Sequence, residues 1–395
     1  MRLKTVPTDF VVIEQLSQAL RGAGPWAVYR LQKVNRTTVE VQTRLAREVN
    51  LPRAKVIFPA LKDKNAATMQ HLSLPAGLSG TLSGEGFKAE RIGYLDRPLT
   101  PSDLAGNRFS MCLRDLDLLE VERLREVVSQ LSRSGMPNYF DQQRFGSYVE
   151  GWGFIGKTIL QRDAEGAIYA YLCRPFVGDP RAVSRFKEQS RKLWPDWTAM
   201  MAEAPRPSNF RSVLTYLIDH PEGYRKALNL IPQRLLSIYL SAYQSYLWNS
   251  IAAELIFEMT GVAENSNPFV EIAGERLPLY QQLSDRTGSQ WRDYRLPLPS
   301  HAARYGRIKP LVDELLSSEG FVLNDLKARI LKTAYVTKNE RAILVFPRHV
   351  SAGTADTDER FPGRHKVQVA FDLPRGSYAT LVIRVVATLA DVSLA

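Results

Sequence analysis

The sequence is most informative at the ten residues Leu61–Gln70, which read LKDKNAATMQ. The apolar run Val56–Leu61 leads into this stretch and predicts a short buried strand. Asp63 follows with a lysine on each side, and two neighbouring cations favour an ionised carboxylate by lowering its pKa. Such a carboxylate can act as a nucleophile or as a base. Charge triplets of this kind are also common in solvated turns, so composition alone leaves both interpretations open.

A second segment combines aromatic rings, amides and an arginine within ten residues. It is Pro137–Gly146, with the sequence PNYFDQQRFG. Rings can stack on the face of a planar base, and amides can hydrogen-bond to its edge. The same composition also suits a turn that contributes aromatic side chains to the core. The segment therefore indicates either a base-binding surface or core packing.

Together the two segments resemble motifs of the tRNA pseudouridine synthase D family. The first is similar to its Gly-Leu-Lys-Asp-Lys/Arg motif, and the second to its Asn-Tyr-Phe-Gly-x-Gln-Arg-Phe-Gly motif. Further segments follow the family's order and extend the resemblance over nearly the whole chain. They are KTVPTDFVV (4–12), LQKVNRTT (31–38), AYQSYLWN (242–249) and LPRGSYAT (373–380).

Strand-like and helix-like periodicities alternate in the first part of the chain, which predicts an α+β sheet domain. The resemblance implies a pseudouridine-synthase-like mixed or antiparallel catalytic sheet with flanking helices, interrupted by a family-specific α/β insertion domain. It implies a catalytic domain in residues 1–156, the insertion in 157–337 and the rest of the catalytic domain in 338–395. The elements predicted are strands at Phe10–Ile13 and Trp26–Leu31, a helix capped by Thr37 and Glu40, and helices at Leu118–Leu131 and Leu235–Met259.

The charge balance favours a polyanionic partner. The 395 residues include 52 Lys and Arg against 41 Asp and Glu, a formal net charge of +11. This excess suits RNA, because neutralised phosphates release counterions.

The cysteines indicate the compartment. Cys112 and Cys173 lie far apart in the sequence and form no CxxC site, so we expect the protein to reside in the reducing cytoplasm. With no signal-peptide pattern and no membrane-length apolar run, we expect a monomeric cytoplasmic protein that binds tRNA, without a membrane or a protein partner.

Several other chemistries lack their sequence signatures. The five histidines are scattered, and neither an HExxH motif nor another helical metal-ligand pair occurs. There is no Walker A loop and no dinucleotide-binding glycine fingerprint. We therefore expect no metal and no cofactor, and chemistry that relies on ordinary side chains.

The resemblance implies isomerisation of uridine 13 in the D arm of tRNA to pseudouridine, with Asp63 as the essential carboxylate. The sequence leaves open whether Asp63 attacks C1′, attacks the uracil ring or abstracts the C2′ proton. Arg144 could pair with a carboxylate, contact phosphate or form a structural ion pair. Lys62 and Lys64 are expected to contact phosphate, since neighbours in an extended loop point apart. The positions that match the family's substrate contacts are Phe10, Asn138 and Tyr378 at the target nucleotide and Phe140 as the ring that stacks on the uracil. Lys4 matches a basic active-site position of the family and could hold Asp63 ionised.

Each of these assignments has a plainer alternative. Phe10 and Phe140 could be core residues, and Lys4 could be an exposed lysine near the N-terminus. The chain also departs from the family motifs, with Ala60 and Asp141 in place of glycine and Val385 where glutamate often follows the arginine. Two rival functions are a non-catalytic tRNA-binding or tRNA-folding protein and a hydrolase that releases free uracil.

Overall fold

The structure is a computed structural model that describes residues 1–62, 67–261 and 268–394. The chain forms two compact units, which we call unit 1 and unit 2. Unit 1 comprises residues 1–136, 281–283 and 345–395, and unit 2 comprises residues 137–280 and 284–344. The chain thus changes unit near residues 136 and 344, whereas the sequence predicted domain boundaries after residues 156 and 337.

Unit 1 is built on a mixed sheet, of which nine strands lie in the described chain. The order is β15-β17-β6-β1-β3-β2-β5-β4, and β16 pairs with β17. The pairing of β1 with β3 is parallel, while the other pairings in this sheet are antiparallel. The strands are β1 Phe10–Leu16, β2 Trp26–Val34, β3 Ala67–Pro75, β4 Thr81–Gly84, β5 Phe87–Leu95, β6 Leu104–Leu116, β15 Arg348–Ala352, β16 Asp356–Thr357 and β17 His365–Pro374.

Three helices of unit 1 accompany this sheet: α1 (Thr38–Glu48), α2 (Leu118–Ser134) and α12 (Ala379–Leu389). Short 3-10 turns occur at η1 (Pro7–Asp9), η2 (Arg53–Lys55) and η3 (Pro101–Asp103). Together the sheet and helices confirm the predicted α+β class with flanking helices.

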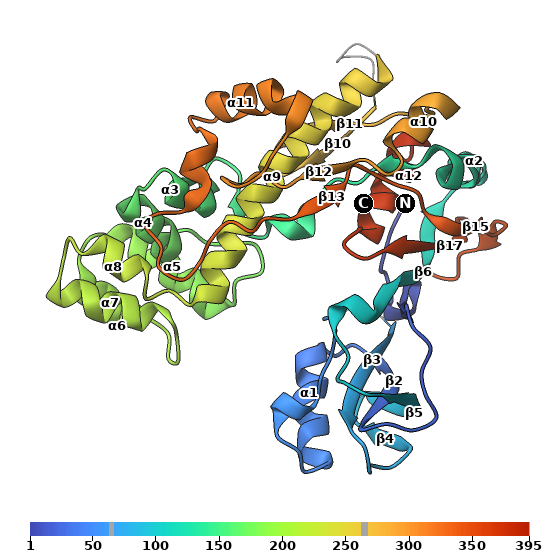
Figure 1. Cartoon of the computed structure of the whole chain (residues 1–395), viewed down its shortest axis with the longest axis horizontal. Coiled ribbons are helices and arrows are strands. Elements are labelled where there is room, and N and C mark those ends of the chain that lie inside the picture. The colour runs from blue at the N-terminus through green and yellow to red at the C-terminus, as the bar shows by residue number, and fades with distance from the viewer. Residues whose placement is uncertain (63–66, 262–267, 395) are drawn as a thin grey trace. The chain divides into compact units, whose positions relative to one another are not determined.

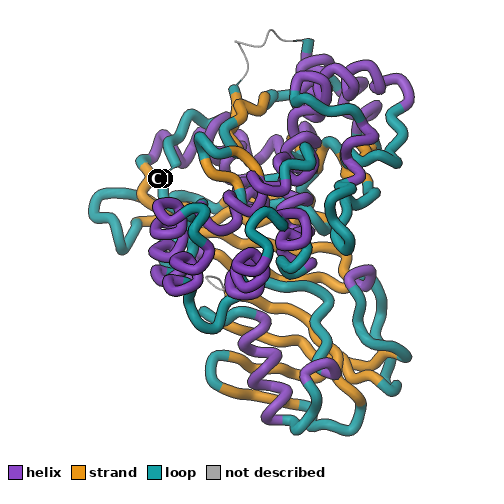
Figure 2. The backbone as a smooth tube through the Cα atoms, turned by 90° about the vertical axis from the view of Figure 1, so that its left-hand side faces the viewer, coloured by secondary structure: helices purple, strands orange, loops and turns teal. Residues whose placement is uncertain are grey.

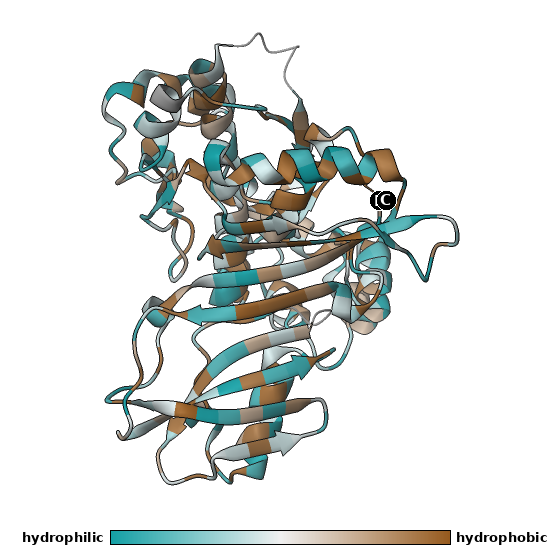
Figure 3. Ribbon diagram, turned by 90° about the vertical axis from the view of Figure 1, so that its right-hand side faces the viewer, coloured by the Kyte–Doolittle hydropathy of each residue, from teal (hydrophilic) through white to brown (hydrophobic). Residues whose placement is uncertain are grey.

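Helix α1 covers one face of the sheet, as Figure 2 shows in its lower part. Hydropathy alternates along the strands (Figure 3), and the buried side chains on that face pack against Val41 and Leu45 of the helix. The predicted capping box is present: the amide of Glu40 donates to Thr37 Oγ1 (3.1 Å), and the amide of Thr37 donates to Glu40 Oε2 (2.7 Å).

The predicted strand at Val56–Leu61 is wrong. Only Ile57 pairs, through two backbone hydrogen bonds with Ser73 of β3 (3.1 and 2.9 Å). Pro59 has no amide hydrogen to continue the ladder, and η2 occupies the chain just before Val56. The apolar side chain of Val56 is still buried, so the sequence correctly indicated a core segment but not its backbone conformation.

Unit 2 is largely helical and centres on α9 (Gln233–Thr260), which confirms the predicted helix at Leu235–Met259. Its remaining helices are α3 Ile155–Leu160, α4 Ala164–Cys173, α5 Arg181–Leu193, α6 Trp197–Glu203, α7 Phe210–Asp219, α8 Tyr224–Leu228, α10 Asp285–Trp291 and α11 Lys309–Ser318, with 3-10 turns η4 Gln142–Phe145, η5 Gly306–Ile308 and η6 Leu323–Lys327. Two hairpins pair β8 (Tyr148–Val149) with β9 (Gly153–Phe154) and β10 (Phe269–Ile272) with β11 (Glu275–Pro278). A third antiparallel pair joins β12 (Arg295–Pro297) to β13 (Glu340–Ala342), which lies far along the chain. Two-residue strands, β7 (Met136–Pro137) and β14 (Leu344–Val345), occur where the chain changes unit.

Candidate active site

The start of unit 1 brings Lys4 and Phe10 together. The ammonium nitrogen of Lys4 lies 4.0 Å from the centroid of the Phe10 ring, close enough for a cation–π interaction. Phe10 is the first residue of β1 and is only 3% exposed. Its ring also meets Phe109 of β6 edge-on, with centroids 6.1 Å apart. Phe10 is therefore held between a core contact and a cation.

A buried ion pair fixes the turn that delivers Phe10 to the sheet. Both carboxylate oxygens of Asp9 accept from Arg114 Nε at 3.0 Å, and one also accepts from the amide of Val6. Arg114 Nη1 donates to Asp358 at 2.8 Å, which adds a second buried carboxylate. The hydrogen bond with Asp9 raises the pKa of Arg114 above its usual value, so the guanidinium stays charged. The network links η1 to Arg114 on β6 and, through it, to Asp358 directly after β16.

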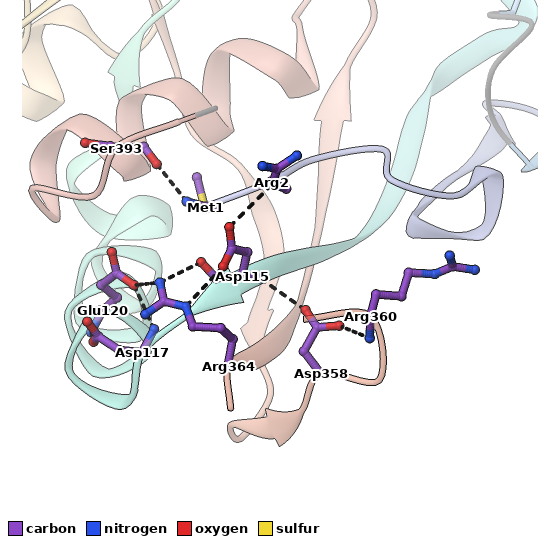
Figure 4. Close-up of polar contacts among 9 residues, drawn as sticks. All are labelled: Met1, Arg2, Asp115, Asp117, Glu120, Asp358, Arg360, Arg364 and Ser393. Atoms are coloured by element: carbon purple, nitrogen blue, oxygen red, sulfur yellow. Dashed lines mark hydrogen bonds and ion pairs between the residues drawn. The ribbon is translucent and has the colours of Figure 1, made fainter. Parts of the chain in front are cut away.

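Further polar contacts beside this network connect residues from both ends of the chain (Figure 4). Arg364 donates to Asp115 (3.1 Å) and to Glu120 (3.0 Å), while the amide of Asp115 donates to Asp358 (3.1 Å). The ammonium group of Met1 donates to the carbonyl of Ser393 at 2.8 Å. The Met1 contact ties the segment that carries Lys4 to the residues after α12.

Asp63 and Lys64 lie outside the described residues, but both flanks of their segment are fixed beside β1. On one side, the amide of Lys62 donates to Thr38 Oγ1 (3.0 Å), and Lys62 Nζ lies 2.9 Å from Glu14 Oε2. On the other side, β3 begins at Ala67, which pairs with Val11 in the parallel ladder. The described residues on either side of Asp63, Lys62 and Ala67, thus both contact the strand that begins at Phe10.

The ion pair of Lys62 with Glu14 is buried, with side chains 10% and 1% exposed. Burial alone would raise the pKa of Glu14. The hydrogen bond from His71 and the charge of Lys62 outweigh it, so the pKa lies below its ordinary value. Lys62 Nζ also donates to Asn107 Oδ1 at 2.6 Å. A phosphate contact of Lys62, as expected from the sequence, would therefore compete with Glu14 and Asn107 for its ammonium group.

We expect Glu14→Gln to destabilise unit 1 by about 3 to 5 kcal/mol at pH 7, since it leaves the ammonium of Lys62 buried without its counterion. A carboxyl group with a lowered folded pKa stabilises the protein above its unfolded pKa, near 4.5, and loses that contribution as pH falls through the folded pKa. The difference between wild type and variant should therefore shrink progressively below about pH 4.5. Denaturant unfolding at several pH values measures it.

A matched control is Asp96→Asn, which removes the partner of Arg21 in a pair whose side chains are 64% and 61% exposed. Exposed pairs contribute about 0 to 1 kcal/mol, so this variant should unfold almost as wild type does at every pH. A Glu14→Gln variant as stable as Asp96→Asn at pH 7 would contradict the buried-pair argument.

In unit 2, Asn138 and Phe140 are brought together by a buried arginine. Arg341 Nε donates to the carbonyl of Asn138 (2.7 Å), and Arg341 Nη2 donates to Asn138 Oδ1 (2.8 Å) and to the carbonyl of Tyr139 (3.2 Å). Its guanidinium carbon also lies 4.2 Å from the centroid of Phe140. The side-chain amide of Asn138 donates in turn to the carbonyl of Ala342 at 2.9 Å. The side-chain amide of Asn138 is therefore held through both its nitrogen and its oxygen.

Phe140 is 7% exposed and is fixed by helix α9. Asn249 accepts from the amide of Phe140 (2.8 Å) and donates to its carbonyl (2.9 Å), while Trp248 meets the ring edge-on at 5.5 Å. Arg144 lies 5.6 Å from the same ring and donates to Ser245 Oγ at 3.1 Å. The structure therefore brings Arg144 against the Phe140 ring, and Arg341 links that ring to Asn138.

The remaining predicted residue, Tyr378, is the N-cap of α12 in unit 1 and is half-buried.

Within the described ranges, no group of three or more His, Cys, Asp or Glu side chains could hold a metal ion. In that same part of the chain, no helix combines the length and apolar character that crossing a membrane requires.

Sequence reasoning missed two residues that organise these contacts, Glu14 and Arg341. The motif around Gln244–Asn249 was noticed as a family resemblance, but its bonds to Phe140 and Arg144 were not assigned. Glu14 lies four residues after Phe10, and a single charged residue in an apolar strand is the signal that could have identified it. Arg341 offers no comparable local signal.

Comparisons with known proteins identify the family of the chain. The family described as "tRNA pseudouridine synthase D (TruD)" matches residues 1–386 of the chain. The "Probable tRNA pseudouridine synthase D 2" of Methanocaldococcus jannaschii is 29% identical over 391 residues, covering 97% of this chain and 91% of the relative. The tRNA pseudouridine synthase D of Leptospira interrogans is 26% identical and covers 97% and 95%. The crystal structure of the putative tRNA pseudouridine synthase D from Methanosarcina mazei superposes with a TM-score of 0.73 at 23% identity, covering 99% and 93% of the two chains.

The mixed sheet with flanking helices is therefore the fold of a pseudouridine synthase. The chain belongs to the tRNA pseudouridine synthase D family, and its enzyme class is that of an isomerase. The resemblance drawn from the sequence motifs is confirmed.

Proposed function

We propose that this enzyme isomerises uridine 13 in the D arm of tRNA to pseudouridine, with Asp63 as the essential carboxylate. The observation that carries the proposal is the anchoring of the Asp63 segment. Lys62 on one flank is paired with Glu14 of β1, and Ala67 on the other flank is paired with Val11. Lys4 lies against Phe10 at the start of the same strand, so a cation and an aromatic ring are available at that end.

The reaction is a rearrangement within one nucleoside. The N1–C1′ bond breaks, the uracil turns, and a C5–C1′ bond forms while C5 loses its proton and N1 gains one. A carboxylate can assist either by covalent attack followed by departure or by proton abstraction. Substrate and product contain the same atoms and the same number of electrons, so the conversion needs no oxidant or reductant.

We assign the other predicted residues to substrate binding. Lys4 keeps the catalytic carboxylate ionised, while Phe10 and Tyr378 contact the target nucleotide from unit 1. Asn138 hydrogen-bonds to the uracil edge, and Phe140 stacks on the ring. Arg144 contacts phosphate, which its guanidinium suits. Extrusion of the uridine from its stack costs a few kcal/mol, and aromatic stacking returns about 1 to 3 kcal/mol per base.

The proposal is tested by incubating the protein alone with a defined tRNA transcript and digesting the RNA to nucleosides. We expect pseudouridine in place of one uridine, and no product from a transcript in which uridine 13 is cytidine. Free uracil would instead indicate a hydrolase, and unchanged uridine would indicate a binding or folding protein. Product from the cytidine transcript would refute the assigned position but not the reaction.

We also propose that the enzyme acts as a monomer in the cytoplasm. Both cysteines, Cys112 and Cys173, are buried free thiols, which suits a reducing compartment. We retain an inserted domain within a catalytic domain as the description of the chain's organisation, since unit 2 is contiguous apart from three residues and unit 1 is assembled from both ends.

A further inference from the structure

The segment that leads into β13 presents a row of cations and one tyrosine to solvent. We call residues 327–339, KARILKTAYVTKN, the basic strap. It has no helix or strand between Ala328 and Asn339, and it is visible as the long orange-red loop that enters β13 (Figure 1). The strap contains four Lys or Arg residues and no Asp or Glu. A surface segment with a single sign of charge attracts a partner of the opposite sign.

The backbone of the basic strap is held in place by amide side chains. Asn229 donates to the carbonyl of Ile330 (2.9 Å) and accepts from the amide of Lys332 (2.7 Å). On α9, Gln233 donates to the carbonyl of Thr333 (2.6 Å), and Gln244 donates to that of Thr337 (2.7 Å). The inward side chains are apolar and buried; they are Ala328, Ile330, Ala334 and Val336. The outward side chains are consequently displayed from a fixed backbone.

The four cations among those outward side chains have no side-chain partners in the described chain. Throughout the described chain, none of Lys327, Arg329, Lys332 and Lys338 forms an ion pair or a side-chain hydrogen bond, and all four are exposed. Tyr335 lies between the last two of them and is 68% exposed. An exposed tyrosine ring among unpaired cations is a combination that binds nucleic acid strands, because the cations contact phosphates and the ring stacks on bases.

We propose that the basic strap binds the sugar-phosphate backbone of an RNA strand and that Tyr335 stacks on an unpaired base of that strand. The inference rests on the proposed function, since it assigns part of the tRNA-binding surface to unit 2. An acidic protein surface would satisfy the four cations but would leave the tyrosine without a matching planar partner. RNA satisfies both kinds of side chain.

The charge contribution is tested with the variant K327Q/R329Q/K332Q/K338Q. Its affinity for an unmodified tRNA transcript, measured by filter binding from about 50 to 200 mM salt, should fall at least tenfold at the lower salt. The slope of log affinity against log salt should become shallower by about 0.7 to 0.9 for each lost contact. A matched control is R181Q/R185Q/R191Q/K192Q on α5, which removes four exposed cations from the same unit.

The control should keep most of the affinity and slope of the wild type. Equal losses in both variants would overturn the proposal, because they would mean that net charge alone matters. An unchanged strap variant would overturn it as well. Binding is measured without turnover, so a wild-type protein that binds the transcript through the strap but forms no pseudouridine would refute only the proposed function.

Stacking is tested separately with Tyr335→Ala and Tyr335→Phe. The alanine variant should weaken tRNA binding by about five- to a hundredfold, whereas the phenylalanine variant should bind as the wild type does. Neither should change the unfolding midpoint, because the ring is exposed. Equal binding by all three proteins, or displacement of tRNA by polyglutamate of equal charge, would overturn RNA as the partner.

Discussion

Asp63→Asn should abolish the conversion of uridine to pseudouridine while leaving tRNA affinity within a few-fold. The amide keeps the shape of the carboxylate but loses its charge, its nucleophilicity and its ability to take a proton. We expect a fall of at least about a thousandfold in the single-turnover rate, as is usual when the residue that acts directly on the substrate is removed. Nucleoside analysis of the digested tRNA measures the rate, and filter binding measures the affinity.

The effect must be specific to this carboxylate. Asp96→Asn serves as the control, because Asp96 is also an aspartate of unit 1 but is 61% exposed in a surface pair with Arg21. It should convert tRNA at the wild-type rate. Comparable single-turnover rates for Asp63→Asn and wild type would remove Asp63 from the chemistry and would favour a role in binding alone.

Signals that act over a few residues predicted the local structure well. Thr37 and Glu40 cap α1 because the side chain of each accepts a hydrogen bond from the backbone amide of the other. The two residues are only three positions apart, so the sequence pattern alone could predict this cap. Gly135 ends α2 with a positive φ of 63°, a conformation that glycine adopts without steric cost. The Val56–Leu61 strand failed because an apolar run reports burial, whereas strand pairing also requires amide hydrogens, which Pro59 lacks.

The partners within the site could not be predicted from local pattern. Arg341 bonds to Asn138 across 203 positions of sequence, and Glu14 pairs with Lys62 only because the fold brings Lys62 beside β1. Single buried charges have no periodicity, so their partners follow from topology rather than from spacing. The family motifs located Asn138 and Phe140 in advance, but not the arginine that organises them.

Phe140→Ala should be strongly destabilising. The ring is 7% exposed, lies 4.2 Å from the guanidinium of Arg341 and meets Trp248 edge-on. Removing it leaves a cavity and deletes a cation–π contact, so we expect a loss of about 3 to 5 kcal/mol in the free energy of unfolding. Phe140→Leu retains much of the volume and should cost about 1 kcal/mol or more. Chemical denaturation of the two variants measures both values.

Stability and catalysis at Phe140 can be separated with the same preparations. If the ring stacks on the extruded uracil, Phe140→Leu should lose about ten- to a hundredfold in single-turnover rate per folded molecule, matching about 1 to 3 kcal/mol of stacking. Phe140→Tyr keeps an aromatic face and should retain most of the rate. If the ring serves only the packing around Arg341 and Trp248, the leucine variant should turn over normally once corrected for its folded fraction. A leucine variant with normal turnover would return Phe140 to the core and leave Phe10 and Tyr378 as the aromatic contacts of the substrate.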